Sequence, residues 1–437
     1  MTLDLKNIHD PVHGSIRVGG VFLDILNRHE MQRLRAVKQL DLSYMVFPGA
    51  NHSRFEHSLG VYHLSGRMAD AVGMSGADAD TVKAAGMLHD ICHAPFSHTM
   101  EEITINRTGM DHMDLARKLI TGDIRTYRER DEDLLGGTCP ISEILEDAGI
   151  SSKEVCDLIA YPSSHNRGLS EFSGEERRSF FPSGDYPHQI IHGPVDADQM
   201  DYLVRDAHFT GVAFGTIDIE RILNTIKVHN DRIVMEKGGM AAAEGLIVSR
   251  SLMYSSVYFH RTVRIIKKMV TKAVEESDLD VGDMYTWDDG DLISALIAEG
   301  GKPSKIVRSV INRRLYKSSV TLFTEKTTDE IVSTLSQYAD YRKRKFLEQE
   351  IADKAGIDIS DVVVDIPSKS TLQSKINIGK TDVSILSEDG RVRSLTRLSP
   401  IAKAIQSRDP FGWSLVVASP KEHSEAVEKA TRRILNL

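Results

Sequence analysis

With 437 residues, of which 41% are apolar and 27% charged, the chain has the composition of a folded protein and the length for a main body with a smaller lobe. Its formal charge of −9 at pH 7 argues against broad nucleic-acid binding, and no apolar run approaches the ~20 residues of a membrane helix. Three cysteines are too few for a disulfide framework or a four-cysteine zinc site, so we expect a soluble protein of the reducing cytoplasm.

Helical periodicity dominates the opening part of the chain. Ser53 and Glu56 are spaced as in a capping box, so a helix is expected to begin at Arg54 and to continue to about residue 72. A second helix is expected over residues 80–93, because Pro95 marks its end. We take residues 1–125 as the first part of a helical core.

The rest of the chain divides into three parts. Periodicity weakens over residues 126–190, where Gly and Pro clusters indicate a variable insert with a short helix or two, and it returns over residues 191–300. In that second part of the core, Asp218 and Asp289 are expected helix starts. Residues 301–437 are expected to form a smaller C-terminal α/β lobe on a mainly α fold. Its expected elements are strands at residues 362–364, 383–386 and 415–417 and a final helix from about Lys421.

Histidine is the unusual residue of this sequence, because seven of its 17 histidines lie between residues 52 and 112. His89 and Asp90 end an apolar run, and imidazole and carboxylate are both good ligands for divalent metals. His57 and Asp198 stand near the starts of two further expected helices. The simpler interpretation is that all four are capped or surface polar residues.

Four blocks of sequence, at residues 32–39, 46–57, 88–98 and 196–206, carry a family resemblance. At these residues the chain resembles the HD superfamily of metal phosphohydrolases, and within it the sterile-alpha-motif and HD-domain deoxynucleoside triphosphate triphosphohydrolases. The resemblance is dense over residues 8–115 and 190–265, and no sterile-alpha-motif domain is recognised. It implies that the two parts of the helical core form one HD-domain body, and that the second part carries the substrate-binding helices.

The resemblance also implies a metal site and an acid/base set. The implied metal ligands are His57, His89, Asp90 and Asp198. The implied catalytic residues are His93, His98, Glu101 and His112. Two nitrogens and two carboxylates do not name the divalent metal ion, which could be manganese, iron, zinc, nickel or magnesium. Which histidine is the general acid stays open, and Met113 departs from the family pattern beside His112.

A deoxynucleoside triphosphate needs cations for its phosphates and polar groups for its sugar. By resemblance, the substrate-binding residues are Arg54 at the α-phosphate, Arg250, Tyr258 and His260 at the phosphate-binding end of the pocket, and Gln39, Tyr202 and Asp206 at the sugar end. Arg250 and Arg261 would hold the far phosphates. The alternative for the tyrosines is that they only pack. We expect a surface or core place for His63 and assign no chemistry to His9, His13 or His52.

The expected activity is hydrolysis of a deoxynucleoside triphosphate to a deoxynucleoside and triphosphate, and the resemblance implies a homo-oligomer, dimeric or tetrameric. Two alternatives stay open: an HD phosphohydrolase of another nucleotide or phosphodiester, and a catalytically idle nucleotide sensor or interaction protein. Activation by a second nucleotide is also open. Gln32 and Arg35 resemble activator-binding positions, whereas Asn27 and Gln199 depart from the family pattern.

Overall fold

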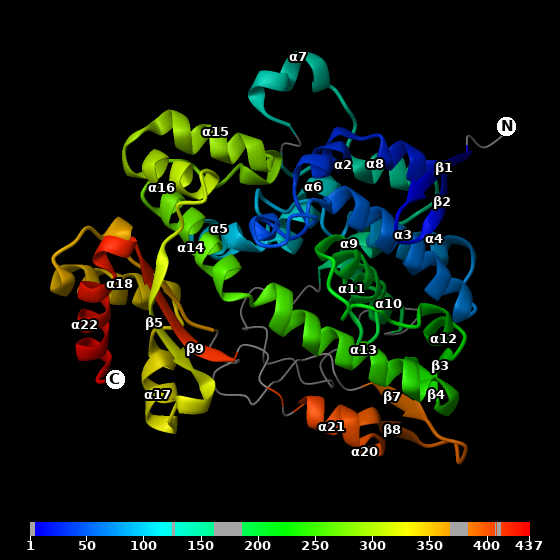
Figure 1. Cartoon of the computed structure of the whole chain (residues 1–437). Helices are drawn as coiled ribbons and strands as arrows, with labels where there is room; N and C mark the ends of the chain where they lie inside the picture. Colours follow the sequence, from blue (N-terminus) through cyan, green and yellow to red (C-terminus); the bar gives the residue numbers. More distant parts are fainter. Residues whose placement is uncertain (1–4, 125–126, 161–185, 368–382, 407, 409–411) are drawn as a thin grey trace.

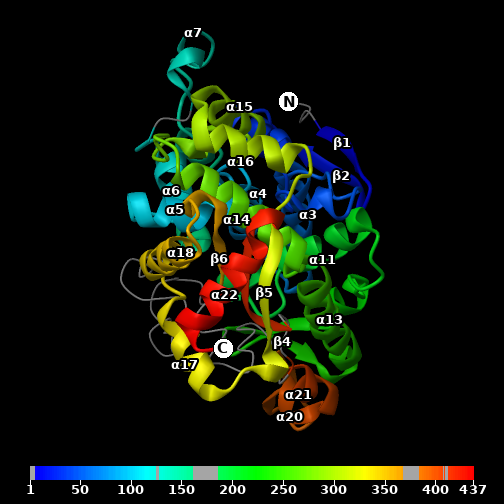
Figure 2. The ribbon, with the colours of Figure 1, turned by 60° about the vertical axis from the view of Figure 1, so that its left-hand side comes forward.

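The computed structural model describes residues 5–124, 127–160, 186–367, 383–406, 408 and 412–437. In these residues the chain forms a large helical body and a smaller lobe of helices and strands beside it (Figure 1, Figure 2). The mainly helical fold with a smaller C-terminal lobe, expected from the sequence, is confirmed. Among the described helices, none has both the length and the apolar composition needed to cross a membrane.

The central helix of the body is α3 (Arg54–Ala71), which packs against α4 (Gly76–Leu88) and α11 (Ala197–Thr210). It begins where the sequence predicts, because the Glu56 carboxylate accepts hydrogen bonds from the backbone and hydroxyl groups of Ser53. Gly60 allows the close approach of α11, since a Cβ atom there would lie 1.9 Å from a carboxylate oxygen of Asp201. Further described helices of the body are α1 (Val21–Leu26), α2 (His29–Arg33), α5 (His98–Thr108), α6 (His112–Thr121), α7 (Glu132–Leu135), α8 (Ile141–Asp147), α9 (Ser152–Ile159), α10 (Tyr186–His192), α12 (Ile219–Leu223), α13 (Met240–Met253), α14 (Arg261–Glu275), α15 (Asp289–Glu299) and α16 (Gly301–Ile311).

The second expected helix ends earlier than predicted. α4 stops at Leu88, whereas the sequence pattern placed its end at His93. The residues that follow form tight turns, in which the Ile91 N–H donates to the Leu88 carbonyl and the His93 N–H donates to the Asp90 carbonyl. His89 and His93 therefore do not share one helical face, as residues four apart would in a helix that continued to His93. The chain turns between them instead.

Two β-hairpins interrupt regions that the sequence pattern assigned to helices. β1 (Leu5–Asp10) pairs with β2 (Gly14–Gly19), and β3 (Ile226–His229) pairs with β4 (Arg232–Glu236), both antiparallel. The second hairpin turns at Asn230 and Asp231, whose positive φ angles of 47° and 61° are typical of a type I′ turn. The helical expectation was wrong here, because such short strands give a weaker periodic signal than the long helices around them.

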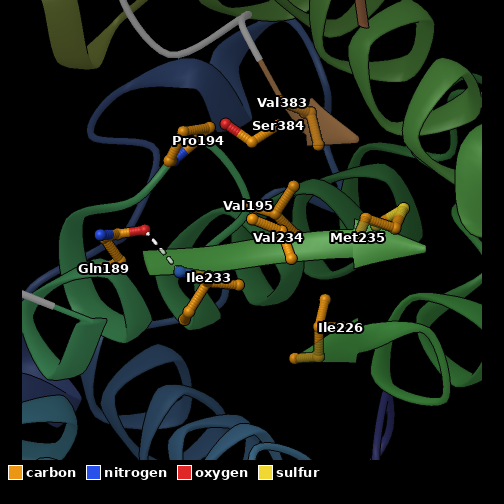
Figure 3. Close-up of a pocket in the computed structure, with 9 residues that line it drawn as sticks. All are labelled: Gln189, Pro194, Val195, Ile226, Ile233, Val234, Met235, Val383 and Ser384. Carbon is orange, nitrogen blue, oxygen red and sulfur yellow. Dashed lines mark hydrogen bonds between the residues drawn. The ribbon is translucent and has the colours of Figure 1, made fainter. Parts of the chain in front are cut away.

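β4 belongs to a four-stranded sheet of order β3-β4-β7-β8, in which β7 (Ser384–Leu386) is parallel to β4 and antiparallel to β8 (Val392–Ser394). Figure 3 shows the beginning of β4, where the Gln189 side chain accepts a hydrogen bond of 3.1 Å from the N–H of Ile233. The cavity beside it has a volume of about 10 Å³ and mostly apolar walls. It has room for a single water molecule and cannot hold a substrate.

The C-terminal lobe contains a three-stranded antiparallel sheet of order β5-β9-β6. Its strands are β5 (Lys317–Phe323), β6 (Val363–Asp365) and β9 (Trp413–Ser419), and its helices are α17 (Asp329–Gln337), α18 (Tyr341–Ala355) and α22 (Ser424–Leu435). The predicted strands at residues 362–364 and 415–417 and the final helix are confirmed. The predicted strand at residues 383–386 also exists, but it pairs with β4 of the body, and α20 (Leu395–Leu398) and α21 (Pro400–Gln406) follow that sheet.

Helices of the expected insert pack on helices of the core: α8 and α9 contact α6, and α9 also contacts α4. α12 begins directly after Asp218, as predicted, and α15 begins at Asp289 with Asp288 as its cap. Two of the proline clusters that indicate the insert, at Pro162 and Pro182, lie outside the described residues.

Candidate metal centre

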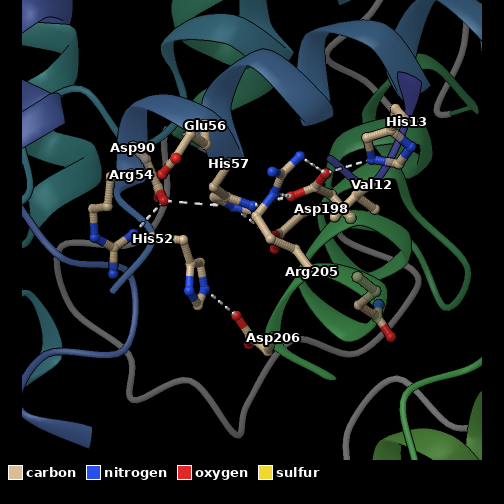
Figure 4. A network of polar contacts seen from close by, with 12 residues as sticks. Val12, His13, His52, Arg54, Glu56, His57, Asp90, Asp198, Arg205 and Asp206 are labelled. Atoms are coloured by element: carbon tan, nitrogen blue, oxygen red, sulfur yellow. Dashed lines mark hydrogen bonds and ion pairs between the residues drawn. The ribbon is translucent and has the colours of Figure 1, made fainter. Parts of the chain in front are cut away.

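Four side chains converge where α3, α11 and the turn after α4 meet. His57 comes from α3, Asp198 from the first turn of α11, and His89 and Asp90 directly follow α4. The Nε2 atom of His57 lies 3.2 Å from Asp198 Oδ1 and 3.7 Å from Asp90 Oδ2. The Nε2 atom of His89 lies 3.3 Å from Asp90 Oδ1 and 3.9 Å from Asp198 Oδ1. Figure 4 shows His57 between the two carboxylates.

The orientation of the two imidazole rings suits a metal ion. Nδ1 of His57 lies 2.7 Å from Asp201 Oδ2, and Nδ1 of His89 lies 2.9 Å from the Gly86 carbonyl oxygen. Because each Nδ1–H donates to an oxygen, each Nε2 can present a lone pair. The Nε2 atom of His89 is buried and has no hydrogen-bond partner among the described residues. Ligand atoms around a divalent metal stand about 3–3.5 Å apart at bond lengths of ~2.1 Å. The buried group of His57, His89 and Asp90 could hold such an ion, and Asp198 lies next to His57 as a candidate fourth ligand.

A proton and a metal ion compete for this centre. Burial lowers the pKa of His57, but hydrogen bonds to Asp198 and Asp201 outweigh it and raise the pKa to about 10. Burial would raise the pKa of Asp90, yet Arg54 and the neighbouring histidines hold that pKa well below its ordinary value. The carboxylate is therefore ionised at neutral pH, and a metal that binds Nε2 of His57 must displace a proton.

A buried hydrogen-bond network, which the sequence does not predict, contacts the Nδ1 side of His57 through Asp201. Asp201 accepts hydrogen bonds from His13 Nε2 at 2.6 Å and from two nitrogens of Arg205 at 2.8 and 2.9 Å. Arg205 also donates to Asp10 at 2.8 Å, so the β1–β2 hairpin is connected to the centre. One feature of the sequence could have predicted this ion pair. Asp201 and Arg205 lie four residues apart on the helix that carries Asp198, a candidate metal ligand.

The expected acid/base set lies beside Asp90. His93 Nε2 is 3.1 Å from Asp90 Oδ1, and the rings of His93 and His112 stack with centroids 4.1 Å apart. Glu101 accepts hydrogen bonds from His112 Nδ1 at 2.5 Å and from His98 Nδ1 at 3.0 Å. One carboxylate therefore orients two of the three histidines.

The charges within this set differ from one ring to the next. Burial and the nearby Arg54 guanidinium lower the pKa of His93 well below its ordinary value. Burial also lowers the pKa of His112, but Glu101 outweighs it and raises that pKa. The pKa values of the two stacked imidazoles are therefore shifted in opposite directions, and His112 holds a proton more readily than His93, as a general acid must.

Arg54 begins α3 and is almost fully buried beside the four ligands. Its Nη1 atom donates to Asp90 and its Nε atom to Ser97 Oγ, whereas Nη2 has no partner among the described residues. An arginine in this position can bind a phosphate oxygen of a ligand. Phe96 and Ser97 have positive φ angles of 49° and 40°, and Asp289 holds this turn by accepting a hydrogen bond of 2.8 Å from the Phe96 N–H.

A polar and aromatic group lies on α11 two turns beyond Asp198. The Asp206 carboxylate accepts hydrogen bonds from the Tyr258 hydroxyl at 2.7 Å and from His52 Nε2 at 2.8 Å. The rings of Tyr202 and Tyr258 meet edge to face, 6.1 Å apart. Gln39 bonds to the His52 carbonyl through its backbone, and its side-chain oxygen is buried without a described partner. The structure thus brings Gln39, Tyr202 and Asp206, expected at the sugar end, together with Tyr258, expected at the phosphate end, and adds His52.

Arg250 lies on α13, and its Nη1 atom is 3.3 Å from Oε1 of Gln199, the residue that follows Asp198 on α11. The Nε atom of Arg250 is buried and has no hydrogen-bond partner among the described residues. The helix after Arg250 is not regular, since residues Tyr254–Tyr258 form a π-helical turn of a kind often found at functional sites. His260 contacts Phe47, and Arg261 contacts Thr321 of β5. Their roles at the phosphates stay a prediction.

Comparison with known families decides the classification. Residues 54–206 match the model of the HD domain, and residues 217–437 match the model of the HD associated region. The chain belongs to the HD-domain phosphohydrolase family. All four candidate ligands of this HD-domain chain fall within the first match, and the HD domain binds a divalent metal, which suits the buried group of His57, His89 and Asp90.

Relatives of this HD-domain chain include proteins with and without a named activity. An uncharacterized protein of Methanocaldococcus jannaschii is 32% identical over 427 residues, which cover 96% of this chain and 80% of that protein. The human deoxynucleoside triphosphate triphosphohydrolase SAMHD1 is 30% identical over 300 residues, which cover 63% of this chain and 45% of SAMHD1. The chain therefore matches less than half of that enzyme.

A solved structure extends the similarity to the whole HD-domain chain. A hypothetical protein from Aquifex aeolicus superposes with a TM-score of 0.69 and 26% identity, over 98% of this chain and 99% of that one. The arrangement of the body and the lobe is therefore shared with a protein of nearly the same extent.

Proposed function

We propose that this protein hydrolyses deoxynucleoside triphosphates to deoxynucleosides and triphosphate with the help of a divalent metal. The observation that carries the proposal is the order of groups along α11. Asp198 joins the metal centre in the first turn, and Asp206 binds Tyr258 and His52 two turns later. A reacting phosphate and a sugar can therefore be held on one helix. The relationship to SAMHD1, whose name states this activity, supports the same substrate class.

The metal-binding residues are His57, His89, Asp90 and Asp198, and an ion bound there would lower the pKa of a water ligand and polarise a phosphoryl oxygen. Arg54 holds the same phosphate through its remaining donor and opposes the negative charge that develops on it. The proton for the departing 5′ oxygen is held by the histidines that Glu101 orients, the part-buried His112 and the exposed His98.

The two ends of the substrate meet different residues. Asp206 and Gln39 offer oxygens to the 3′ hydroxyl, and the Tyr202 and Tyr258 rings cover the deoxyribose, where a 2′ hydroxyl would meet an aromatic surface. The Nε atom of Arg250 has no hydrogen-bond partner among the described residues, and this arginine binds the far phosphates.

Product analysis tests this function directly. The metal-loaded protein is incubated with each deoxynucleoside triphosphate, singly and mixed, in oxygen-18 water, and the products are identified by mass spectrometry. Attack on the phosphorus nearest the sugar places the label in inorganic triphosphate beside unlabelled deoxynucleoside. Orthophosphate or pyrophosphate as the primary product would contradict the proposal.

Two controls separate the alternatives. Nucleoside monophosphates and a dinucleotide phosphodiester, run in parallel, reveal a phosphohydrolase of another substrate, whereas binding without turnover of any of them indicates a sensor. His57→Ala and His63→Ala form a matched pair on α3. The first variant should lose both metal and turnover, and the second should keep both.

We also propose that the protein works in the cytoplasm as a homo-oligomer, dimeric or tetrameric, on the basis of the family relationship. The proposed division is an HD core at residues 1–125 and 191–300, an insert at 126–190 and a lobe at 301–437. Light scattering with and without nucleotide tests the assembly, and a fully active strict monomer would contradict it.

A further inference from the structure

A strongly charged cleft is lined by residues of three helices, α5, α14 and α18. These helices are labelled in Figure 1 and Figure 2. The volume of the cleft is about 220 Å³, far larger than that of the cavity beside β4. Its charged lining residues are His98, Glu102, Arg264, Lys267, Lys268 and Arg344. The cleft therefore presents four basic side chains and one carboxylate, and of the residues assigned to the metal centre and its substrate it shares His98 alone.

The carboxylates that pair with two of these cations lie behind them. Asp365 accepts hydrogen bonds of 2.7 and 2.6 Å from Arg264, and its own side chain is 3% exposed. Asp41 lies 2.8 Å from the ammonium group of Lys267 and is 1% exposed. Neither carboxylate lines the cleft. These ion pairs therefore hold the two cations from the rear and leave their other N–H donors for a ligand.

The other two cations share one carboxylate of the cleft, and Nη2 of Arg344 also lies 3.5 Å from Glu275, which does not line it. Lys268 and Arg344 both donate to Glu102, and the Nε atom of Arg344 is buried without a hydrogen-bond partner among the described residues. Burial and then repulsion by Arg344 lower the pKa of Lys268 in spite of Glu102. A bound anion would accept hydrogen bonds from these donors and would offset the repulsion between them.

We propose that this cleft binds a phosphate-type oxyanion, either the phosphate chain of a nucleotide or an inorganic oligophosphate. The guanidinium forks and ammonium groups match the several oxygens of a phosphate chain, whereas a monocarboxylate would leave most donors unused. Charged walls disfavour an apolar ligand. The site does not depend on which substrate the metal centre takes.

The position of the cleft connects the proposed acid/base set with the C-terminal lobe. α5 carries both His98 and Glu101, and the next residue, Glu102, binds Arg344 of α18. A ligand bound between these helices would therefore change the orientation of the His98 side chain. Binding at this place can influence turnover without contact to the metal ligands.

Calorimetric titration of inorganic triphosphate into the full, metal-loaded chain tests the proposal. Two classes of binding event are expected. Lys268→Met should weaken one of them about tenfold, the cost of one charge-assisted contact, and should leave the other unchanged. Methionine retains the length of the lysine stem and therefore its packing. Arg250→Ala should affect only the event at the metal centre, and Lys429→Met, at an exposed position of α22, should affect neither.

A replacement variant and a second ligand complete the titration experiment. Lys267→Met replaces Lys268→Met if the latter does not fold with the parental melting temperature. A deoxynucleoside diphosphate that binds the cleft more tightly than triphosphate identifies a nucleotide ligand, and equal binding identifies the phosphate chain alone. The proposal is overturned if folded lysine variants bind triphosphate as the parent does, or if Arg250→Ala removes all binding. A wrong substrate assignment would instead appear as absent turnover with binding in the cleft retained.

Discussion

Asp201 accepts a hydrogen bond of 2.7 Å from Nδ1 of His57 while Arg205 binds both of its oxygens. This contact determines which nitrogen of His57 faces the other proposed metal ligands. A carboxylate can only accept, so it keeps the proton on Nδ1 and the lone pair on Nε2. An amide in its place can donate to Nδ1 and shift the proton to Nε2, which then cannot bind a metal.

Asp201→Asn is therefore expected to weaken metal binding about 10- to 100-fold. Metal content after dialysis against buffered free metal measures the effect, and thermal unfolding is followed in parallel. Asp10→Asn is the matched control, because both variants alter a carboxylate that binds Arg205 but only Asp201 touches His57. Equal loss of metal from the two variants would show that destabilisation, and not the imidazole proton, is responsible.

The residues of the proposed metal centre could be predicted because they lie in short contiguous motifs, His89-Asp90 above all. The support behind them could not, because the contact from His13 to Asp201 spans 188 residues and depends on the β1–β2 hairpin. That hairpin consists of two six-residue strands, which were hidden by stronger helical periodicity nearby. Long-range pairing of this kind leaves no local pattern.

The same distinction holds for the shape of the site. The capping pair Ser53 and Glu56 specifies the start of α3 locally, and that start was predicted correctly. The end of α4 was misplaced because turns after Leu88, together with contacts from distant residues such as Asp289, position the chain up to Ser97. The π-helical turn after Met253 could not be predicted either, because Arg250, Tyr254 and Tyr258 are spaced four residues apart, as in an ordinary α-helix.

A second prediction concerns the two carboxylates on α11. Asp198→Ala should remove the bound metal and the turnover, because it opens the coordination sphere, and should leave the fold intact because the side chain is 27% exposed. Asp206→Ala, on the same helix, should keep the metal and raise KM by about tenfold, since it loses hydrogen bonds to the sugar. Metal analysis and steady-state kinetics distinguish the two. Turnover at the parental rate by metal-free Asp198→Ala would refute the ligand assignment.

The pH dependence of stability follows from Glu102. Burial would raise the pKa of Glu102, but Lys268 and Arg344 lower it from 4.5 to about 2. Between these values the unfolded chain binds a proton that the folded chain does not. The stabilisation is therefore fully present above about pH 4.5 and is lost as the pH falls toward 2.

Glu102→Gln should consequently lower the free energy of unfolding at pH 7 by at most about 3 kcal/mol, less any screening at this partly exposed group. Urea unfolding at pH 7, 5 and 3.5 should show the difference between parent and variant shrinking at the lowest pH. Glu425→Gln, at an exposed helical pair, is the control and should change little at any pH. A difference that stays constant down to pH 3.5 would contradict the assigned pKa.

The last prediction separates chemistry from binding through two arginines. Arg54 contacts Asp90 and has one donor remaining for the proposed reacting phosphate, whereas Arg250 contacts Gln199 and is proposed to bind the far phosphates. Charge at the α-phosphate develops in the transition state, so Arg54→Ala should lower kcat by about 10²- to 10³-fold with a smaller change in KM. Arg250→Ala should raise KM about tenfold and leave kcat within a few-fold of the parent, because the far phosphates carry the same charge before and during the reaction. Metal content must match the parent in both variants, since a loss at Arg54→Ala would mean that the change acts through Asp90. Equal effects of the two substitutions on kcat would show that the arginines do not divide the phosphate chain between them.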